Sequence, residues 1–172
     1  LDMPTISLVA FSATAILGLV LCLLWWREPS SELIGWWGVA QLIMASGIAF
    51  AAAASFSRNP ALLAFGQALM VLAGAVMWMA VREFEGRKLH RLWVAVWPCG
   101  FVIAAAAGIA ATFDQRLILT STLLAVLCLL TAAEFTRQEG ERLVSRWPAI
   151  VLLLITGVGY LTWMPLSLSM PI

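Results

Sequence analysis

Long apolar stretches, separated by short polar breaks, dominate the pattern of hydrophobic and polar positions along this chain. A helix needs about 20 mostly apolar residues to cross the roughly 30 Å hydrocarbon core of a bilayer. Six segments meet this requirement, and every break between them contains charged residues. The pattern therefore predicts one all-α domain over residues 1–172, a bundle of six transmembrane helices at 5–26, 33–55, 60–81, 92–112, 117–135 and 148–168.

Prolines mark several of the predicted helix ends. Pro60 and Pro148 suit the first turn of a helix, where a backbone N–H has no intrahelical partner. Pro165 removes a helical hydrogen bond, so we expect the last helix to stop near it. The chain begins without an initiator Met or a basic segment, which predicts no cleavable signal peptide and a few residues missing before Leu1.

The composition agrees with a membrane location. Hydrophobic residues make up 63% of the chain and charged residues 11%, whereas soluble domains carry about 25% charged residues. Such a chain needs lipid to cover its apolar side chains, so its first partner is the bilayer. The net charge is +1 and the basic residues are dispersed, which argues against a nucleic-acid partner.

The distribution of Lys and Arg predicts the orientation of the bundle. Eight of the ten basic residues lie in the first, third and fifth breaks, and the second and fourth breaks hold only Arg58 and Arg116. Cytoplasmic loops retain positive charge, so the odd breaks are predicted to be cytoplasmic and the N-terminus outside. Six crossings then leave the C-terminus outside as well, and a cytoplasmic domain downstream would need a seventh helix.

Small residues within the apolar segments predict close contacts between helices. In lipid, helices associate through tight packing, which Gly and Ala permit. The spacing favours three such stripes: Gly47 with Ala51, Gly66 with Gly74, and Gly100 with Ala104 and Gly108. Packing of this kind also favours a homodimer.

A few polar residues inside the apolar segments are the candidate binding residues. Each must find a partner within the bundle. Counting 1.5 Å per residue from the outer helix ends places Gln67, Ser121 and Tyr160 in the same half of the membrane, and Gln41 is a further candidate. These residues could enclose a ligand. The alternative is a set of interhelical hydrogen bonds that only fixes the packing.

Other residue types offer little chemistry. The single histidine, His90, lies in a charged break, so a bis-histidine haem site or a histidine-rich metal site cannot be built. Three cysteines occupy apolar stretches that suit small buried side chains: Cys22, Cys99 and Cys128. No phosphate loop, nucleophile triad or pair of buried carboxylates is present, so we predict no catalytic residue, no metal ligand and no cofactor in this chain.

Residues near the predicted interfaces have simpler roles. Glu134 is the acid of the fifth apolar segment, and its position near a break predicts that it reaches water or Arg137. Seven tryptophans lie close to the predicted cytoplasmic ends, where indole rings favour the membrane interface. They are Trp25, Trp26, Trp36, Trp37, Trp93, Trp97 and Trp147.

Five short motifs follow one another in a recognisable order. They are Leu1-Asp2 with Thr5, Gly35-Trp36-Trp37, Phe84-Glu85-Gly86-Arg87, Leu130-Thr131-Ala132-Ala133-Glu134, and Arg146-Trp147-Pro148. Together they resemble the N-terminal membrane region that precedes GGDEF domains in many proteobacterial diguanylate cyclases. The resemblance covers nearly the whole chain.

The resemblance implies a sensory or regulatory input module in the bacterial inner membrane. In such proteins a further helix re-enters the cytoplasm and joins a GGDEF domain, which condenses two GTP molecules into cyclic di-GMP. No catalytic residue can be carried over, because the matching positions lie outside this chain. Signalling would then follow from a shift of helix packing that changes dimerisation of the downstream domain.

Two other functions remain open at this stage. A small transporter or permease subunit would need a water-filled path and internal repeats, and neither is evident in the sequence. A structural subunit of a larger membrane complex would need no downstream domain.

Overall fold

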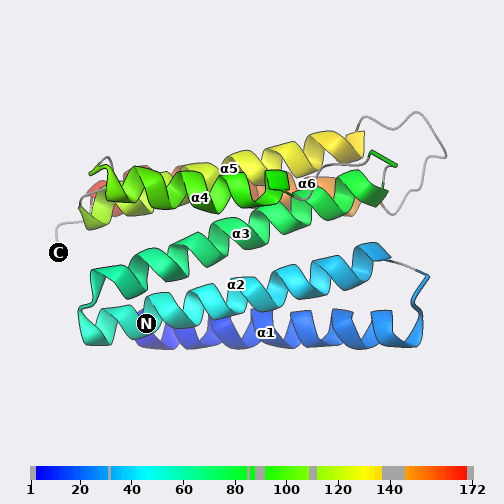
Figure 1. The fold of residues 1–172 in the computed structure, drawn as a ribbon, viewed down its shortest axis with the longest axis horizontal. Helices are drawn as coiled ribbons and strands as arrows, with labels where there is room; N and C mark the ends of the chain where they lie inside the picture. The colour runs from blue at the N-terminus through cyan, green and yellow to red at the C-terminus, as the bar shows by residue number, and fades with distance from the viewer. Residues whose placement is uncertain are drawn as a thin grey trace.

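The computed structural model describes residues 3–30, 32–84, 86–87, 92–108, 112–136 and 146–169. Within these ranges the chain is all-α, as predicted (Figure 1). The helices are α1 (Met3–Arg27), α2 (Glu32–Ser57), α3 (Pro60–Phe84), α4 (Leu92–Ala106), α5 (Phe113–Thr136) and α6 (Arg146–Ser169).

Four helices have the length and composition of membrane spans. They are α1 from Thr5, α2, α3 and α5, which run for 23 to 26 residues. The 15-residue α4 and the apolar Trp147–Thr162 part of α6 are shorter. At 1.5 Å per residue, α4 covers only about 22 Å of the roughly 30 Å hydrocarbon core. These helices identify the chain as a membrane protein.

Local capping explains several helix boundaries. Asn59 caps α3, because its Oδ1 accepts hydrogen bonds from the backbone N–H groups of Ala61 and Leu62 at 3.0 and 3.4 Å. At the start of α5, Thr112 and Gln115 each accept a hydrogen bond from the backbone of the other, at 3.3 and 3.2 Å. This capping box starts α5 four residues before the predicted 117.

Two boundary predictions are wrong. The fourth helix was expected to reach residue 112 but ends at Ala106, after which Gly108 adopts a left-handed backbone with φ of +78°. The sixth helix was expected to stop near Pro165 but continues to Ser169. Membrane helices tolerate proline because neighbouring groups satisfy the freed backbone carbonyl, and Pro98 likewise lies inside α4.

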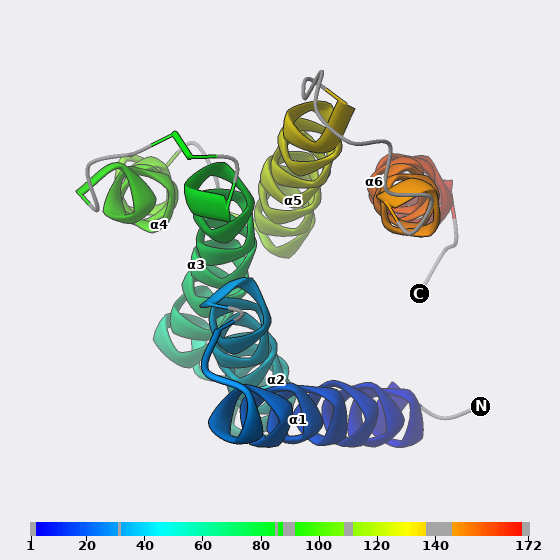
Figure 2. The same ribbon diagram turned by 90° about the vertical axis from the view of Figure 1, so that its right-hand side faces the viewer.

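The helices form an open arrangement around α3. Among the described residues, α1 packs on α2, α2 packs on α3, and α3 also contacts α4 and α5, whereas α6 packs on α5 alone. Figure 2 shows α4 and α5 on either side of α3, with α6 beyond α5. The C-terminal ends of α1, α3 and α5 lie at one end of the bundle (Figure 1). We call this the arginine end, because Arg27, Arg82 and Arg87 lie there.

Glycine contacts hold the first three helices together, as predicted for Gly47 and Gly66. A Cβ atom on Gly66 would lie 2.8 Å from the Gly47 carbonyl oxygen and 2.8 Å from the Ala51 nitrogen, so α2 and α3 touch backbone to backbone. A Cβ on Gly38 of α2 would lie 3.1 Å from the Gly18 carbonyl oxygen of α1. The backbones of both helix pairs therefore approach as closely as a glycine allows.

The third predicted stripe is wrong, whereas Gly74 does lie at a helix contact. A Cβ on Gly74 would meet the side chains of Leu127 and Leu124 of α5 at 3.1 and 3.3 Å. Around Gly100 and Gly108, no atom lies within 4 Å of an added Cβ. Gly100 is exposed on α4, and Gly108 serves the turn that follows it.

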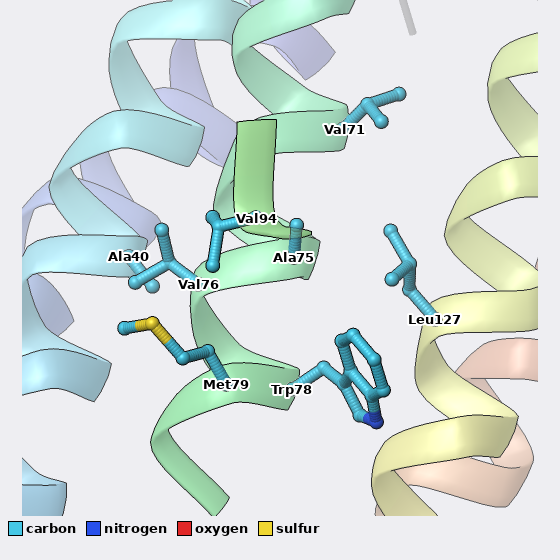
Figure 3. Packing of buried hydrophobic residues seen from close by; sticks show 8 residues of the cluster. All are labelled: Ala40, Val71, Ala75, Val76, Trp78, Met79, Val94 and Leu127. Atoms are coloured by element: carbon cyan, nitrogen blue, oxygen red, sulfur yellow. The ribbon is translucent and has the colours of Figure 1, made fainter. Parts of the chain in front are cut away.

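The main buried cluster is centred on α3. Figure 3 shows Val71, Ala75 and Trp78 turned toward Leu127 of α5, whereas Val76 lies on the side of α2. The buried members of the cluster are Ala40, Val71, Ala75, Val76, Trp78, Met79, Val94 and Leu127. A second cluster joins α3, α5 and α6 and comprises Val81, Ala132, Phe135, Ile150 and Leu153.

Candidate functional site

A buried carboxylate held by two arginines is the most distinctive polar feature of the described structure. Glu134 lies in the last turn of α5, and its side chain is only 7% exposed. Its Oε1 atom is 3.6 Å from Nε of Arg82, and its Oε2 atom accepts a hydrogen bond from Nη1 of Arg87 at 3.4 Å. A buried carboxylate in a membrane protein requires such partners, because an unpaired charge would be very costly there.

The turn after α3 delivers the second arginine. Gly86 has a φ of +74°, which favours glycine, and its N–H bonds to the carbonyl of Glu83 at 2.9 Å. The N–H of Arg87 bonds to the carbonyl of Arg82, also at 2.9 Å. This pair of bonds is a Schellman motif, which turns the chain back over the helix end. Arg87 is therefore returned toward α5, where Glu134 lies.

Aromatic side chains surround the ion pairs. The guanidinium carbon of Arg82 lies 5.2 Å from the centre of the Trp78 ring, within cation–π range. Trp78 in turn meets Trp97 of α4 edge to face, with ring centres 6.3 Å apart. The ring centre of Phe135 of α5 lies 6.4 Å from that of Trp37 of α2. Helices α2, α3, α4 and α5 are thus joined at the arginine end.

The site has more hydrogen-bond donors than acceptors. Three of its buried nitrogen atoms have no hydrogen-bond partner among the residues that the structure describes: Nε of Arg82 and the indole Nε1 atoms of Trp78 and Trp37. One carboxylate against two guanidinium groups leaves a net charge of +1. The arrangement can hold helices in register and can respond to a competing anion or carboxylate, but it presents no nucleophile.

The structure corrects the prediction for Glu134. This residue was expected to reach water or Arg137, yet it is buried and pairs with Arg82 of α3 and with Arg87, which follows α3. Arg137 lies outside the described residues. In the sequence, Arg82 and Arg87 indicate only the orientation of the bundle, and no pattern marks Trp78. The sequence signal for this contact was an acid near the end of one apolar segment and a base directly after another, Glu134 and Arg82.

The predicted polar residues fall into two groups. Gln67 of α3 and Ser121 of α5 are both buried. The two helices run in the same direction (Figure 1). At one end Arg116 donates a hydrogen bond to the Pro60 carbonyl at 3.0 Å, and at the other end Arg82 pairs with Glu134. These two contacts fix the register of the helices. That register places Gln67 level with Ser121. The Oε1 atom of Gln67 is buried and has no hydrogen-bond partner.

The other two predicted residues lie on different helices. Tyr160 is half-buried on α6, whose close backbone contacts in the described part of the chain are to α5. Gln41 is half-buried on α2. The contact between Gly47 and Gly66 is level with Gln67, and Gln41 lies nearer the arginine end than this contact. A ligand pocket formed by all four residues stays a prediction, and the geometry favours only the pair on α3 and α5.

The tryptophans predicted at the membrane interface fall into an exposed group and a half-buried group. Trp26, Trp93 and Trp147 are 82%, 57% and 67% exposed, which suits contact with the membrane interface. Trp36, Trp37 and Trp97 are instead half-buried and pack against the two clusters. Trp25 is 41% exposed and lies against Gly35 of α2.

Possible metal ligands do not gather in the described part of the chain. No three His, Cys, Asp or Glu side chains there could hold a metal ion together. His90 lies outside the described residues. Cys22 and Cys128 are half-buried free thiols, and Cys99 is an exposed one.

Comparison with known proteins adds no family. No family model matches the chain. Neither a curated protein nor a solved structure matches it.

Proposed function

We propose that this chain is the sensory or regulatory membrane region of a diguanylate cyclase and controls cyclic di-GMP synthesis by a downstream cytoplasmic GGDEF domain. One observation supports the proposal most directly. Two of the motifs that carry the resemblance meet in space, since Arg87 ends one and Glu134 ends the other, and their side chains form a hydrogen bond. These motifs therefore have a common physical role at the arginine end.

The proposed mechanism uses this ion pair as a latch between α3 and α5. Glu134 is two residues from the end of α5, and the chain continues from there to α6 and toward any downstream domain. A stimulus that loosens the latch would let α5 and α6 shift relative to α3. Within the described ranges the close backbone contacts of α6 are to α5, so α6 can move together with α5. Such a shift would change how two copies of the protein dimerise.

The proposal includes six spans in the bacterial inner membrane with the N-terminus outside. The C-terminal ends of α1 and α3, with Arg27, Arg82 and Arg87, lie at the same end of the bundle (Figure 1), which supports a single cytoplasmic end. The shorter α4 would cross where its flanking residues complete the span or where the bilayer thins. A seventh helix would then lead into the cytoplasm.

Reading the gene beyond the codon for Ile172 tests the assignment. We expect a further apolar span followed by a Gly-Gly-Asp/Glu-Glu-Phe motif. A stop codon at that point would remove the cyclase proposal. A small transporter subunit or a structural subunit of a larger membrane complex would then be the better account.

A further inference from the structure

Two adjoining cavities lie at the arginine end, on the side of α3 that faces α2. Each has a volume of about 280 Å³, and they share Glu32, Trp36 and Glu83. Small-molecule sites usually have volumes from about 300 Å³ upward, so each cavity suits a small ligand. The first is further lined by Ser30, Leu33, Ala80 and Phe84, and the second by Trp25, Gly35 and Val39.

The two indole rings of this cavity are held by close packing. A Cβ atom added to Gly35 would lie 2.7 to 2.9 Å from three atoms of the Trp25 ring, so the ring rests directly on the α2 backbone. Trp36 is half-buried and packs against the cluster centred on α3. Both rings are therefore set in place before any ligand arrives, which lowers the entropic cost of binding.

Glu32 and Glu83 supply the carboxylates of the cavity. Among the described residues, no Lys or Arg side chain forms an ion pair with Glu32 or Glu83. The nearest candidate along the chain, Arg82, is directed to Glu134 and to the ring of Trp78 instead. The cavity thus combines two indole rings with two carboxylates that have no ion pair within the described ranges, while Arg82 and Arg87 pair with Glu134 of α5.

We propose that this cavity binds an organic ammonium cation. Indole faces attract alkylammonium groups through the ring quadrupole, and a carboxylate supplies the complementary charge. A small hard metal ion would need more oxygen ligands than these two carboxylates supply. The cation can come from a soluble quaternary amine or from the ethanolamine or choline headgroup of a lipid. The site does not depend on the cyclase assignment, because its test measures binding alone.

The direct test is calorimetric titration of choline into the full chain in nanodiscs of phosphatidylglycerol, a lipid without an amine. Protein-free nanodiscs supply the blank for non-specific attraction to the anionic lipid. We expect saturable binding that Glu83→Gln weakens about tenfold. The matched control is Glu28→Gln, because Glu28 is exposed near the same turn and lines neither cavity. This control should bind as the wild type does.

A second pair of variants tests the aromatic wall. Trp25→Leu should weaken choline binding about fivefold, whereas Trp26→Leu should leave it unchanged, because Trp26 is 82% exposed and lines neither cavity. Circular dichroism and gel filtration of each variant establish that the fold is retained. If Trp25→Leu fails to fold, Gly35→Ala serves in its place, since it displaces the ring without removing it.

Added phosphatidylethanolamine separates the two sources of the cation. If this lipid in the nanodisc prevents choline binding, the occupant is a lipid headgroup, and if choline still binds, the occupant is a soluble amine. Both results support the site. The proposal is overturned if choline does not bind in phosphatidylglycerol nanodiscs, or if the Glu83 and Glu28 variants bind it equally.

Discussion

Removing the negative charge of Glu134 should destabilise the bundle more than any other single charge change among the described residues. The variant Glu134→Gln keeps the size of the side chain and its ability to accept hydrogen bonds. It abolishes both ion pairs, at 3.6 Å to Arg82 and 3.4 Å to Arg87. The two guanidinium groups would then repel each other without a counter-ion between them.

The magnitude follows from the distances and the exposure of the partners. At an effective dielectric constant of 20, each ion pair attracts by about 5 kcal/mol before desolvation is subtracted. The Arg82 side chain is 25% exposed and that of Arg87 is 49% exposed, so solvent screens the second pair more. We therefore expect Glu134→Gln to lower the free energy of unfolding by about 2 to 3 kcal/mol, between the values for exposed and buried pairs.

The two arginine variants should follow in a fixed order. Arg82→Gln loses the better-buried ion pair and the contact with the Trp78 ring, and should cost about 2 kcal/mol. Arg87→Gln should cost less than about 1 kcal/mol because half of its side chain is exposed.

Unfolding by sodium dodecyl sulfate in mixed micelles, followed by tryptophan fluorescence and circular dichroism, measures these differences. Glu28→Gln is the control, since Glu28 is exposed and outside the ion pairs. A double-mutant cycle of Arg82→Gln with Glu134→Gln should give a coupling energy above about 1 kcal/mol. The reasoning is refuted if Glu134→Gln unfolds as the control does, or if the two substitutions simply add.

Three further substitutions test the packing and the turns by the same unfolding assay. Gly66→Ala should lower the free energy of unfolding by about 1 to 3 kcal/mol, because its Cβ would lie 2.8 Å from backbone atoms of α2. Gly100→Ala, with open space around it, should be neutral or stabilising by up to about 1 kcal/mol. Equal effects of the two substitutions would contradict the helix contact at Gly66. Gly86→Ala should cost about 1 to 2 kcal/mol because φ is +74° there, and its effect should shrink when Arg87→Gln is already present. Asn59→Ala should cost about 1 kcal/mol by removing the cap of α3, and an unchanged stability would exclude that cap.

The sequence was sufficient for the elements whose ends have local causes. The start of α3 was predicted to the residue, because Pro60 marks its first position and the polar residues Arg58 and Asn59 precede it. The end of α4 was missed, since an apolar run continues past Ala106 and only the backbone of Gly108 shows that the helix has stopped. Likewise, the helix through Pro165 reflects a membrane environment that outweighs the local preference of proline.

The candidate site was harder to predict because its parts come from distant segments. Glu134 was recognised as an unusual acid, but its partner Arg87 is 47 residues away and is brought back by a turn that depends on Gly86. Likewise, small residues predicted that Gly47 and Gly66 lie at helix contacts, without pairing them, but also a stripe at Gly100 that has no neighbour within 4 Å among the described residues. Spacing alone shows that helices can approach each other, and only the arrangement of the helices shows which of them do.

The most direct test of the central claim is the cyclic di-GMP output of the full-length protein in cells. Residues 1–172 would be replaced by an unrelated multi-helix membrane anchor of the same orientation, with equal expression established by immunoblotting. The account predicts that the replacement changes cyclic di-GMP levels, and that Glu134→Gln in the otherwise native protein changes them as well. Unchanged cyclic di-GMP levels after the replacement would contradict the account, because these helices would then serve only as an anchor.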